Sequence, residues 1–294
     1  MTGLVYDLPL YRPPSEAPNL IIQATIGCSF NRCTFCAMYK TKEFRARDLD
    51  DVFADIAEAA KMEPGTRRVF LADGDALVLP TAQLVQILDR LKDTFPELQR
   101  VTTYALPANL LKKSVEELAE LRAHGLTLLY YGIETGSPDL LKRIRKGATP
   151  QGMIEGLGKA REAGLKTSCT VILGVGGKNR WRDHIECTAD LVSKAAPEFV
   201  STLQLTLDGT TMEDYLTSFG EPFVFQDDEG ILDEQELFVS RIAPASPIIF
   251  RSNHASNALA LKGTLPKDRD KLVAQIRAAK TDSSILRPTW ARAL

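Results

Sequence analysis

The chain has 294 residues, 44% of them hydrophobic and 25% charged, with 36 basic and 38 acidic residues and a formal net charge of −2. A chain of this length buries enough apolar surface to fold without a metal or a disulfide, so any metal site needs a functional reason. The near-neutral charge argues against a broad nucleic-acid footprint, and no apolar run is long enough to span a membrane.

The N-terminal arm, residues 1–19, is rich in proline and polar residues and is predicted to be irregular. It lacks the basic and apolar segments of a secretory signal, so a cytoplasmic location is expected. In that reducing compartment the five cysteines are expected to be thiols or metal ligands rather than disulfides.

Apolar strands alternate with amphipathic helices over the next two hundred residues. The predicted strands are 20–26, 68–72, 101–105, 126–133, 166–174 and 199–205. The predicted helices between them are 50–61, 81–94, 114–124, 150–163 and 182–194. Such alternation predicts parallel strands joined by helical crossovers, either as a partial (β/α) barrel of six units or as an open doubly wound sheet.

In both architectures, catalytic and ligand-binding residues lie at the carboxyl ends of the strands. Four unusual features follow predicted strands in this chain: a cysteine cluster, Asp73-Gly74-Asp75, Glu134, and the glycine-rich turn 174–177. We therefore expect these four features to converge at one edge of the sheet.

The alternation ends after residue 207. An acidic turn is predicted at 227–230, a helix or extended segment at 233–245, a further strand at 247–250 and a helix at 266–280. The predicted organisation is an arm (1–19), a barrel (20–207) and a C-terminal α/β extension (208–294) that covers the barrel and contributes to the substrate site.

The cysteines at 28, 33 and 36 form a C-x4-C-x2-C cluster directly after the first predicted strand. Three cysteines this close together in a cytosolic chain indicate a metal more often than packing. Structural zinc needs a fourth ligand, and the remaining cysteines and histidines are all distant in sequence. Three thiolates alone suit a [4Fe–4S] cluster that keeps one iron open to another ligand.

Four basic residues follow the cluster: Lys40, Lys42, Arg45 and Arg47. They could form a local nucleic-acid patch, but a solvated face is the favoured interpretation.

The cysteine cluster and its position resemble those of radical SAM enzymes. The resemblance implies a partial (β/α)6 barrel of the TIM type and a [4Fe–4S] cluster held by Cys28, Cys33 and Cys36. It also implies reductive cleavage of S-adenosylmethionine (SAM) to methionine and a 5′-deoxyadenosyl radical that takes hydrogen from a substrate. Phe35 occupies the aromatic position before the last cysteine, while the first gap is one residue longer than the usual pattern.

Further cofactor residues follow from the same resemblance. Asp73, Gly74 and Asp75 occupy the place that binds the SAM amino group, and Glu134 the place that contacts the ribose or the methionyl part. A cation for the SAM carboxylate is expected among three residues, with the last two favoured: Arg143, Arg145 and Lys146. Residues near the adenine are expected to be Tyr39, Ile172, Gly174, Gly176, Gln204 and Leu205.

The substrate is much less constrained by the sequence. Residues 208–294 contain no second cysteine cluster, and neither a cobalamin-binding domain nor an added basic barrel is expected, so a small organic substrate is favoured. Arg251 and His254 are hypothesised to close the substrate side, with a hydrogen-bonded loop as the alternative. A reductant such as flavodoxin or ferredoxin is the expected partner. Two other functions remain open: a tRNA-modifying radical SAM enzyme, and a non-catalytic iron–sulfur or zinc protein.

Overall fold

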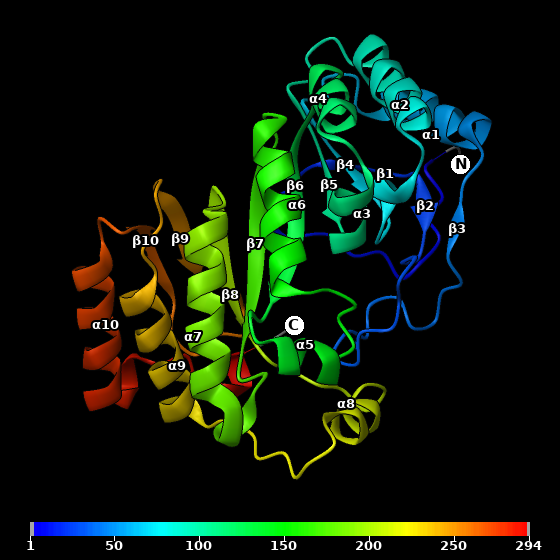
Figure 1. The fold of residues 1–294 in the computed structure, drawn as a ribbon. Helices are drawn as coiled ribbons and strands as arrows, with labels where there is room; N and C mark the ends of the chain where they lie inside the picture. The colour runs from blue at the N-terminus through cyan, green and yellow to red at the C-terminus, as the bar shows by residue number, and fades with distance from the viewer. Residues whose placement is uncertain (1–2, 293–294) are drawn as a thin grey trace. The chain divides into compact units, whose positions relative to one another are not determined.

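The computed structural model describes residues 3–292, and Figure 1 labels its helices and strands. Eight of the strands are connected by mostly parallel pairing. These strands are hydrogen-bonded in the order β1-β4-β5-β6-β7-β8-β9-β10. Their bounds are β1 Leu20–Gln23, β4 Arg68–Ala72, β5 Arg100–Ala105, β6 Leu126–Glu134, β7 Lys166–Leu173, β8 Phe199–Gln204, β9 Ile248–Ser252 and β10 Leu261–Leu265. The sheet does not close on itself, and the predicted α/β fold of the partial-barrel type is confirmed.

Strand positions agree with the sequence patterns except at the first strand. The predicted strand 20–26 is wrong at its carboxyl end, because β1 stops at Gln23. Residues Thr25–Ile26 form β2, which pairs antiparallel with β3, Arg45–Ala46, in a separate two-stranded sheet. The C-terminal strand predicted at 247–250 corresponds to β9, while β10, which pairs antiparallel with it, was not predicted.

Helices connect the strands, as the alternation requires. They are α1 Leu49–Met62, α2 Thr81–Thr94, α3 Pro107–Lys112, α4 Val115–Ala123, α5 Pro138–Arg143, α6 Pro150–Glu162, α7 Gly177–Ala195, α8 Met212–Phe219, α9 Asp228–Arg241 and α10 Arg269–Thr281. Short 3-10 turns lie at Pro14–Glu16, Ala76–Val78, Ser283–Ile285 and Thr289–Ala291. None of the helices within residues 3–292 is long and apolar enough to cross a membrane.

Several helix predictions need correction. The acidic segment 227–230 is the start of α9 rather than a turn, because the Asp227 side chain accepts a hydrogen bond from the Gly230 amide and caps the helix. Helix α7 begins at Gly177, five residues before its predicted start, since glycine obscures helical periodicity. The short helices α3, α5 and α8 were not predicted, because six to eight residues show too few turns for a periodic signal.

The chain divides into two compact units, and the boundary between them falls inside the cysteine loop. The first unit comprises Met1–Asn31, Met38–Tyr131 and Gly158–Thr167. The second comprises Arg32–Ala37, Gly132–Leu157 and Ser168–Leu294. Cys28 therefore belongs to the first unit, and Cys33 and Cys36 belong to the second.

In the first unit, aromatic side chains fill one face of the sheet. Phe70 on β4 packs edge-to-face against Tyr104 on β5, with ring centroids 5.1 Å apart, and Tyr130 on β6 lies within 6.3 Å of both. The N-terminal arm reaches the same ring of Tyr130, whose hydroxyl donates to the buried Glu16 carboxylate. Arg100 pairs with Glu16 at 3.0 Å, so the arm is fixed to the sheet by a neutralised buried charge.

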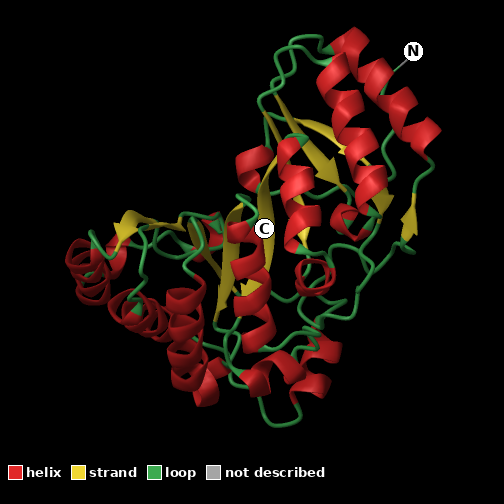
Figure 2. Ribbon diagram, turned by 45° about the horizontal axis from the view of Figure 1, so that its top comes forward, coloured by secondary structure: helices red, strands yellow, loops and turns green. Residues whose placement is uncertain are grey.

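In the second unit, α7, α9 and α10 form a row over the strands β8, β9 and β10 (Figure 1). Figure 2 shows these helices along one side of the strands of the same unit. Apolar side chains explain the packing: Phe238 of α9 faces Phe250 of β9, and both are fully buried. Each such side chain contributes about 2–3 kcal/mol of burial free energy.

The basic segment after the cysteines is only partly a solvated face. Arg45 fits that prediction, with 60% of its side chain exposed beside Asp7. For Lys42 the prediction is wrong: only 3% of its side chain is exposed, and its ammonium lies 2.9 Å from the fully buried carboxylate of Asp73. A buried carboxylate needs a cationic partner, which the linear pattern of charges does not reveal.

Replacing Lys42 with methionine should lower the free energy of unfolding by about 3–5 kcal/mol, because the buried Asp73 charge then has no cation. Urea denaturation measures the change. Arg45→Met is the matched control and should cost at most about 1 kcal/mol. The double variant Lys42→Met/Asp73→Asn should regain part of the lost stability. Equal stability of the single variants Lys42→Met and Arg45→Met would contradict the pairing of Lys42 with Asp73.

Candidate active site

In the second unit, the cysteine loop contacts the end of α5. The Thr34 amide donates to the Ile144 carbonyl at 3.1 Å, and the Cys36 amide donates to the Cys33 carbonyl at 3.4 Å. Both thiols are partly exposed, and neither is in a disulfide. The loop is therefore a tight turn in which both cysteines are partly exposed.

A buried ion pair lies beside these two thiols. Lys146 Nζ is 2.8 Å from Glu134 Oε1, with about a tenth of each side chain exposed. The Lys146 ammonium also lies 5.8 Å from the centre of the Phe35 ring. Burial alone would lower the pKa of Lys146, but Glu134 and the thiols of Cys33 and Cys36 raise it above its ordinary value. The cation is thus held in its charged form next to two potential thiolates.

The ion pair requires glycine at position 132 of β6. A Cβ atom there would overlap Glu134 Oε1 and lie 2.7 Å from Lys146 Nζ. Glu134 itself has a φ of 61°, which turns its side chain out of the strand direction. The second carboxylate oxygen of Glu134 accepts a hydrogen bond from Thr170 of β7 at 3.4 Å.

The two neighbouring arginines point to other partners. Arg145 pairs with Asp214 at 3.1 Å, with half of its side chain exposed. Arg143 pairs with Asp139 at 2.7 Å and donates to the Phe219 carbonyl. Of the three predicted cations, only Lys146 therefore lies beside the thiols.

In the first unit, the segment before Cys28 is joined to the turn after β4. The Gly27 amide donates to Asp73 Oδ2 at 3.1 Å, and the Gly74 amide donates to the Gly27 carbonyl at 3.0 Å. The Ser29 hydroxyl donates to Asp75. The two residues that flank Cys28 are thus hydrogen-bonded to the turn Asp73-Gly74-Asp75 in this unit.

Asp75 is buried, and burial raises its pKa to about 6 despite the hydrogen bond from Ser29. Its Oδ1 atom, like Oδ1 of Asp73, is buried with no hydrogen-bond donor within residues 3–292. Buried acceptors without a donor are unusual, and an ammonium group would satisfy them.

Gly74 and Tyr39 are in direct contact in the same unit. A Cβ atom on Gly74 would lie 2.5 Å from Cε2 of the Tyr39 ring, so only glycine fits beneath this ring. Tyr39 is 3% exposed and also packs edge-to-face against Tyr11. The ring predicted to border the adenine is thus packed on the turn predicted to bind the amino group.

The glycine-rich turn after β7 lies in the second unit and adopts a left-handed backbone at Gly174 and Gly177, with φ of 81° and 55°. The Gly174 amide donates to Glu234 Oε2 of α9 at 2.6 Å. Gly176 is the N-cap of α7, and the preceding strand residue Ile172 is largely buried. The turn therefore ends at a helix N-terminus, which is a favourable environment for a polar ligand.

Two buried titratable side chains support this turn. Burial lowers the pKa of His184 to about 4, so the ring is neutral; its Nε2–H donates to the Ile172 carbonyl at 3.0 Å, and Nδ1 lies 2.9 Å from the Thr135 hydroxyl. Burial raises the pKa of Glu234 to about 8. His184 Nε2 and Glu234 Oε2 are 3.9 Å apart.

The carboxyl end of β8 is fixed by the loop after β9. Asn257 accepts from the Gln204 amide at 2.9 Å and donates to the Thr202 carbonyl at 2.7 Å. Gln204 Oε1 is buried with no donor in the described part of the chain. Leu205 packs on the apolar cluster that contains Ile172 and Tyr215.

The proposed substrate residues lie in or next to this loop. His254 Nδ1 is 2.8 Å from the Ser256 hydroxyl, and burial and Arg287 lower its pKa. Arg251 donates to the carbonyls of Phe250 and Gly263, at 2.7 and 3.4 Å. These contacts resemble the alternative of a hydrogen-bonded loop, and a substrate role for both residues stays a prediction.

Zinc is not favoured by the positions of the remaining ligand types. Within residues 3–292, no group of three or more His, Cys, Asp or Glu side chains, the loop cysteines included, lies close enough together to hold a metal ion. His184 uses both ring nitrogens in hydrogen bonds, and Cys169 is fully buried. Cys28, Cys33 and Cys36 are partly exposed and none is in a disulfide, and three thiolates are the donor set that a [4Fe–4S] cluster with one open iron takes.

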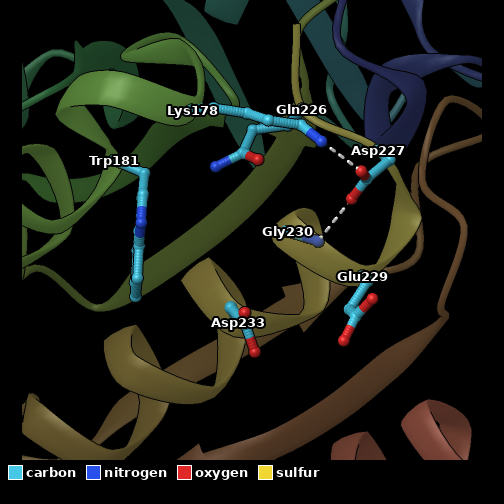
Figure 3. Close-up of a pocket in the computed structure, with 7 residues that line it drawn as sticks. All are labelled: Lys178, Trp181, Gln226, Asp227, Glu229, Gly230 and Asp233. Carbon is cyan, nitrogen blue, oxygen red and sulfur yellow. Dashed lines mark hydrogen bonds and ion pairs between the residues drawn. The ribbon is translucent and has the colours of Figure 1, made fainter.

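A separate pocket of about 270 Å³ lies on the second unit, between the start of α7 and the start of α9 (Figure 3). It is lined by Lys178, Trp181, Gln226, Asp227, Glu229, Gly230 and Asp233. In Figure 3 the Asp227 carboxylate lies between Lys178 and the Gly230 amide. None of its lining residues was predicted as a site residue.

The sequence matches a family model described as the radical SAM superfamily over residues 22–192. The chain belongs to the radical SAM superfamily. Members of this superfamily are enzymes that use a [4Fe–4S] cluster and SAM. Membership confirms the resemblance seen in the cysteine motif, and it makes a non-catalytic metal carrier an inferior explanation.

Individual relatives within the radical SAM superfamily are distant. An uncharacterized methyltransferase of Pyrococcus horikoshii is 25% identical over 71% of this chain and 45% of its own length. Biotin synthase of Afipia carboxidovorans is 33% identical over 55% of this chain and 45% of its own length. The chain spans about half or less of the length of the curated relatives it matches.

Solved structures agree with the fold. Methylornithine synthase has a TM-score of 0.55 at 17% identity, over 88% of this chain and 68% of its own. Coproporphyrinogen III oxidase from Escherichia coli has the same TM-score and identity, over 75% of this chain and 52% of its own. At such identities the likeness concerns the fold alone.

Several residues that contact the predicted site residues were missed in the sequence. Glu234 and His184 lie far from any motif, and only their burial and hydrogen bonds identify them. Ser29 and Gly132 lie within predicted motifs, but nothing in their spacing distinguishes them from linkers.

Glu234→Gln should change how stability depends on pH. The folded pKa of Glu234, about 8, lies above that of an unfolded glutamate, so its contribution is present at acid pH and is lost as pH rises through about 8. Glutamine does not titrate. The stability of the variant relative to the wild type should therefore rise by about 2–3 kcal/mol between about pH 6 and about pH 9.

Urea denaturation at each pH measures this difference, with Glu229→Gln, an exposed carboxylate on the same helix, as control. A difference between Glu234→Gln and wild type that stays constant with pH would contradict a buried, protonated Glu234.

Proposed function

We propose that the chain catalyses reductive cleavage of SAM and that the resulting 5′-deoxyadenosyl radical abstracts hydrogen from a small organic substrate. Cys28, Cys33 and Cys36 would hold the [4Fe–4S] cluster, which supplies the electron for that cleavage when a reductant such as flavodoxin or ferredoxin has reduced it. The observation that carries the proposal is the buried Lys146–Glu134 pair beside the thiols of Cys33 and Cys36.

The positive charge of Lys146 suits the binding of iron by neighbouring cysteine thiolates. Thiolates, not thiols, bind iron, and a cation within electrostatic range favours the thiolate form. Lys146 is nine-tenths buried and keeps its charge because Glu134 neutralises it. A structural role alone would not require this pair to lie beside two accessible cysteines.

We assign the SAM carboxylate to Lys146 rather than to Arg145 or Arg143, because Lys146 is the buried cation beside Cys33 and Cys36. Arg145 and Arg143 instead pair with Asp214 and Asp139. Glu134 then accepts from the ribose hydroxyls or the methionyl part. In the first unit, Asp75 and Asp73 each offer a buried carboxylate oxygen that lacks a donor within residues 3–292, which suits the SAM ammonium.

The remaining predicted residues are proposed to contact the adenine of SAM. Gly174 and Gly176 allow a flat ring to approach the backbone closely, and Ile172 and Leu205 offer apolar surface from the same cluster. Gln204 has a buried amide oxygen available to accept from an exocyclic amine. Tyr39 remains a proposed neighbour of the adenine.

The substrate class remains the least constrained part of the proposal. One relative is the tRNA-2-methylthio-N(6)-dimethylallyladenosine synthase of a Shewanella species, 25% identical over 58% of this chain. The basic residues after the cysteines nevertheless have partners: Lys42 and Arg45 pair with Asp7, and Arg47 with Asp55. A small molecule is therefore preferred to RNA, with Arg251 and His254 on the substrate side. The division into arm, barrel and extension, and the cytoplasmic location, also stay predictions.

Serine at Cys28, Cys33 or Cys36 should reduce iron from about four atoms per chain to less than one after anaerobic reconstitution, because a serine hydroxyl is a poor iron ligand. Production of 5′-deoxyadenosine from SAM and dithionite should be lost with it. Iron analysis, absorption near 400 nm and chromatography are the measurements.

Cys187→Ser is the matched control, since this thiol hydrogen-bonds to Asp183 and has no place in the proposed site. It should bind iron as the wild type does. Zinc in place of iron in the wild type would contradict the proposal.

Lys146→Met should weaken SAM binding about tenfold or more, because the carboxylate loses a buried cationic partner. Arg145→Met is the control on the adjacent residue and should leave the dissociation constant unchanged. Calorimetric titration of SAM into each reconstituted variant measures both. Weaker SAM binding in Arg145→Met, with unchanged binding in Lys146→Met, would instead assign the SAM carboxylate to Arg145.

A further inference from the structure

We propose that Glu234 of α9 is a positioning residue for SAM: it holds the glycine-rich turn 174–177 in the shape that receives the adenosine part of the cofactor. The inference rests on the proposed function. It adds a residue outside the segment that matches the superfamily, since the match covers 22–192.

The contact between Glu234 and the turn is direct and buried. Glu234 is fully buried, and its Oε2 accepts the Gly174 amide hydrogen at 2.6 Å. Its other oxygen accepts from Gln226 Nε2 at 3.0 Å. Each carboxyl oxygen therefore has one fixed donor, which defines the orientation of the group.

Gly174 needs an outside acceptor because of where it lies. It follows the last residue of β7, and its φ of 81° turns the amide away from the strand. A buried amide without an acceptor is costly, so the turn keeps this shape only while an acceptor faces it. Glu234 supplies that acceptor from a helix sixty residues away in sequence.

Other contacts limit how far the turn can adjust. A Cβ atom on Gly174 would lie 3.1 Å from Ile231 Cδ1 of α9, so the helix packs directly on the turn. The Lys178 amide donates to the Val224 carbonyl at 2.8 Å, which fixes the other end of the turn. The turn is thus held between α9 and the segment that precedes α9 in the chain. Glu234 makes the polar contact with the turn, through the Gly174 amide.

Gln226 links Glu234 to the pocket at the start of α9 (Figure 3). Its side chain lines that pocket and also donates to Glu234. A Cβ atom on Gly230 would overlap Gln226 Oε1, so glycine at 230 leaves room for this side chain. The support of the turn therefore extends from Gly174 through Glu234 to Gln226.

Two variants of similar volume separate the acceptor from the packing. Glu234→Gln keeps an oxygen for the Gly174 amide, and Glu234→Met fills the space without one. On anaerobically reconstituted full-length protein, Met should raise the dissociation constant of SAM about tenfold, and Gln by about threefold or less. Deuterium exchange at 174–177 without SAM should be faster in the Met variant than in the Gln variant.

The matched control is Glu229→Met, an exposed glutamate on the same helix, which should bind SAM as the wild type does. Unchanged SAM affinity in Glu234→Met, with only a lower melting temperature, would overturn the inference and leave the proposed function intact. A wild-type protein that binds no SAM would overturn both.

If the Met variant does not fold, Gln226→Leu gives a second test. Gln226 is only half-buried, and its loss should free the Glu234 carboxyl and weaken SAM binding about threefold. An unchanged dissociation constant in that variant would equally overturn the inference.

Discussion

The ion pair between Lys146 and Glu134 is the constraint on which the rest of the second unit's site depends. A charge nine-tenths buried is tolerated only when it is paired, so the positions of both side chains are coupled. Gly132 leaves the space for the pair, and the left-handed backbone at Glu134 directs the carboxylate toward it. The result is a cation fixed beside the partly exposed Cys33 and Cys36, an arrangement that suits an anionic ligand.

Polar groups at the ends of other strands also need partners, and other segments of the chain supply them. Where a parallel strand stops, its last backbone and side-chain polar groups lose their ladder partners and need others. After β4, Asp73 accepts from Gly27 and pairs with Lys42. After β7, Gly174 donates to Glu234. In each case the partner comes from another segment of the same unit, so the turn is only as well defined as that segment.

The same dependence involves the C-terminal segment 208–294, which contacts two strand ends of the second unit. Helix α9 contributes Glu234 to the turn after β7, and the loop after β9 contributes Asn257 to the end of β8. Both contacts involve backbone amides at positions where radical SAM enzymes are proposed to hold the cofactor.

The sequence by itself determined the parallel α/β architecture and the superfamily, because apolar periodicity and the C-x4-C-x2-C spacing are local signals. It placed β4 and α2 at their observed residues and named Lys146 and Arg145 as alternatives. Only the tertiary structure distinguishes the surroundings of these two residues, because Lys146 pairs with Glu134 and Arg145 pairs with Asp214. Likewise the burial of Lys42, and the contacts of Glu234 and His184, arise between segments distant in sequence. No pattern along the chain encodes such contacts, because they exist only after the strands and helices have packed.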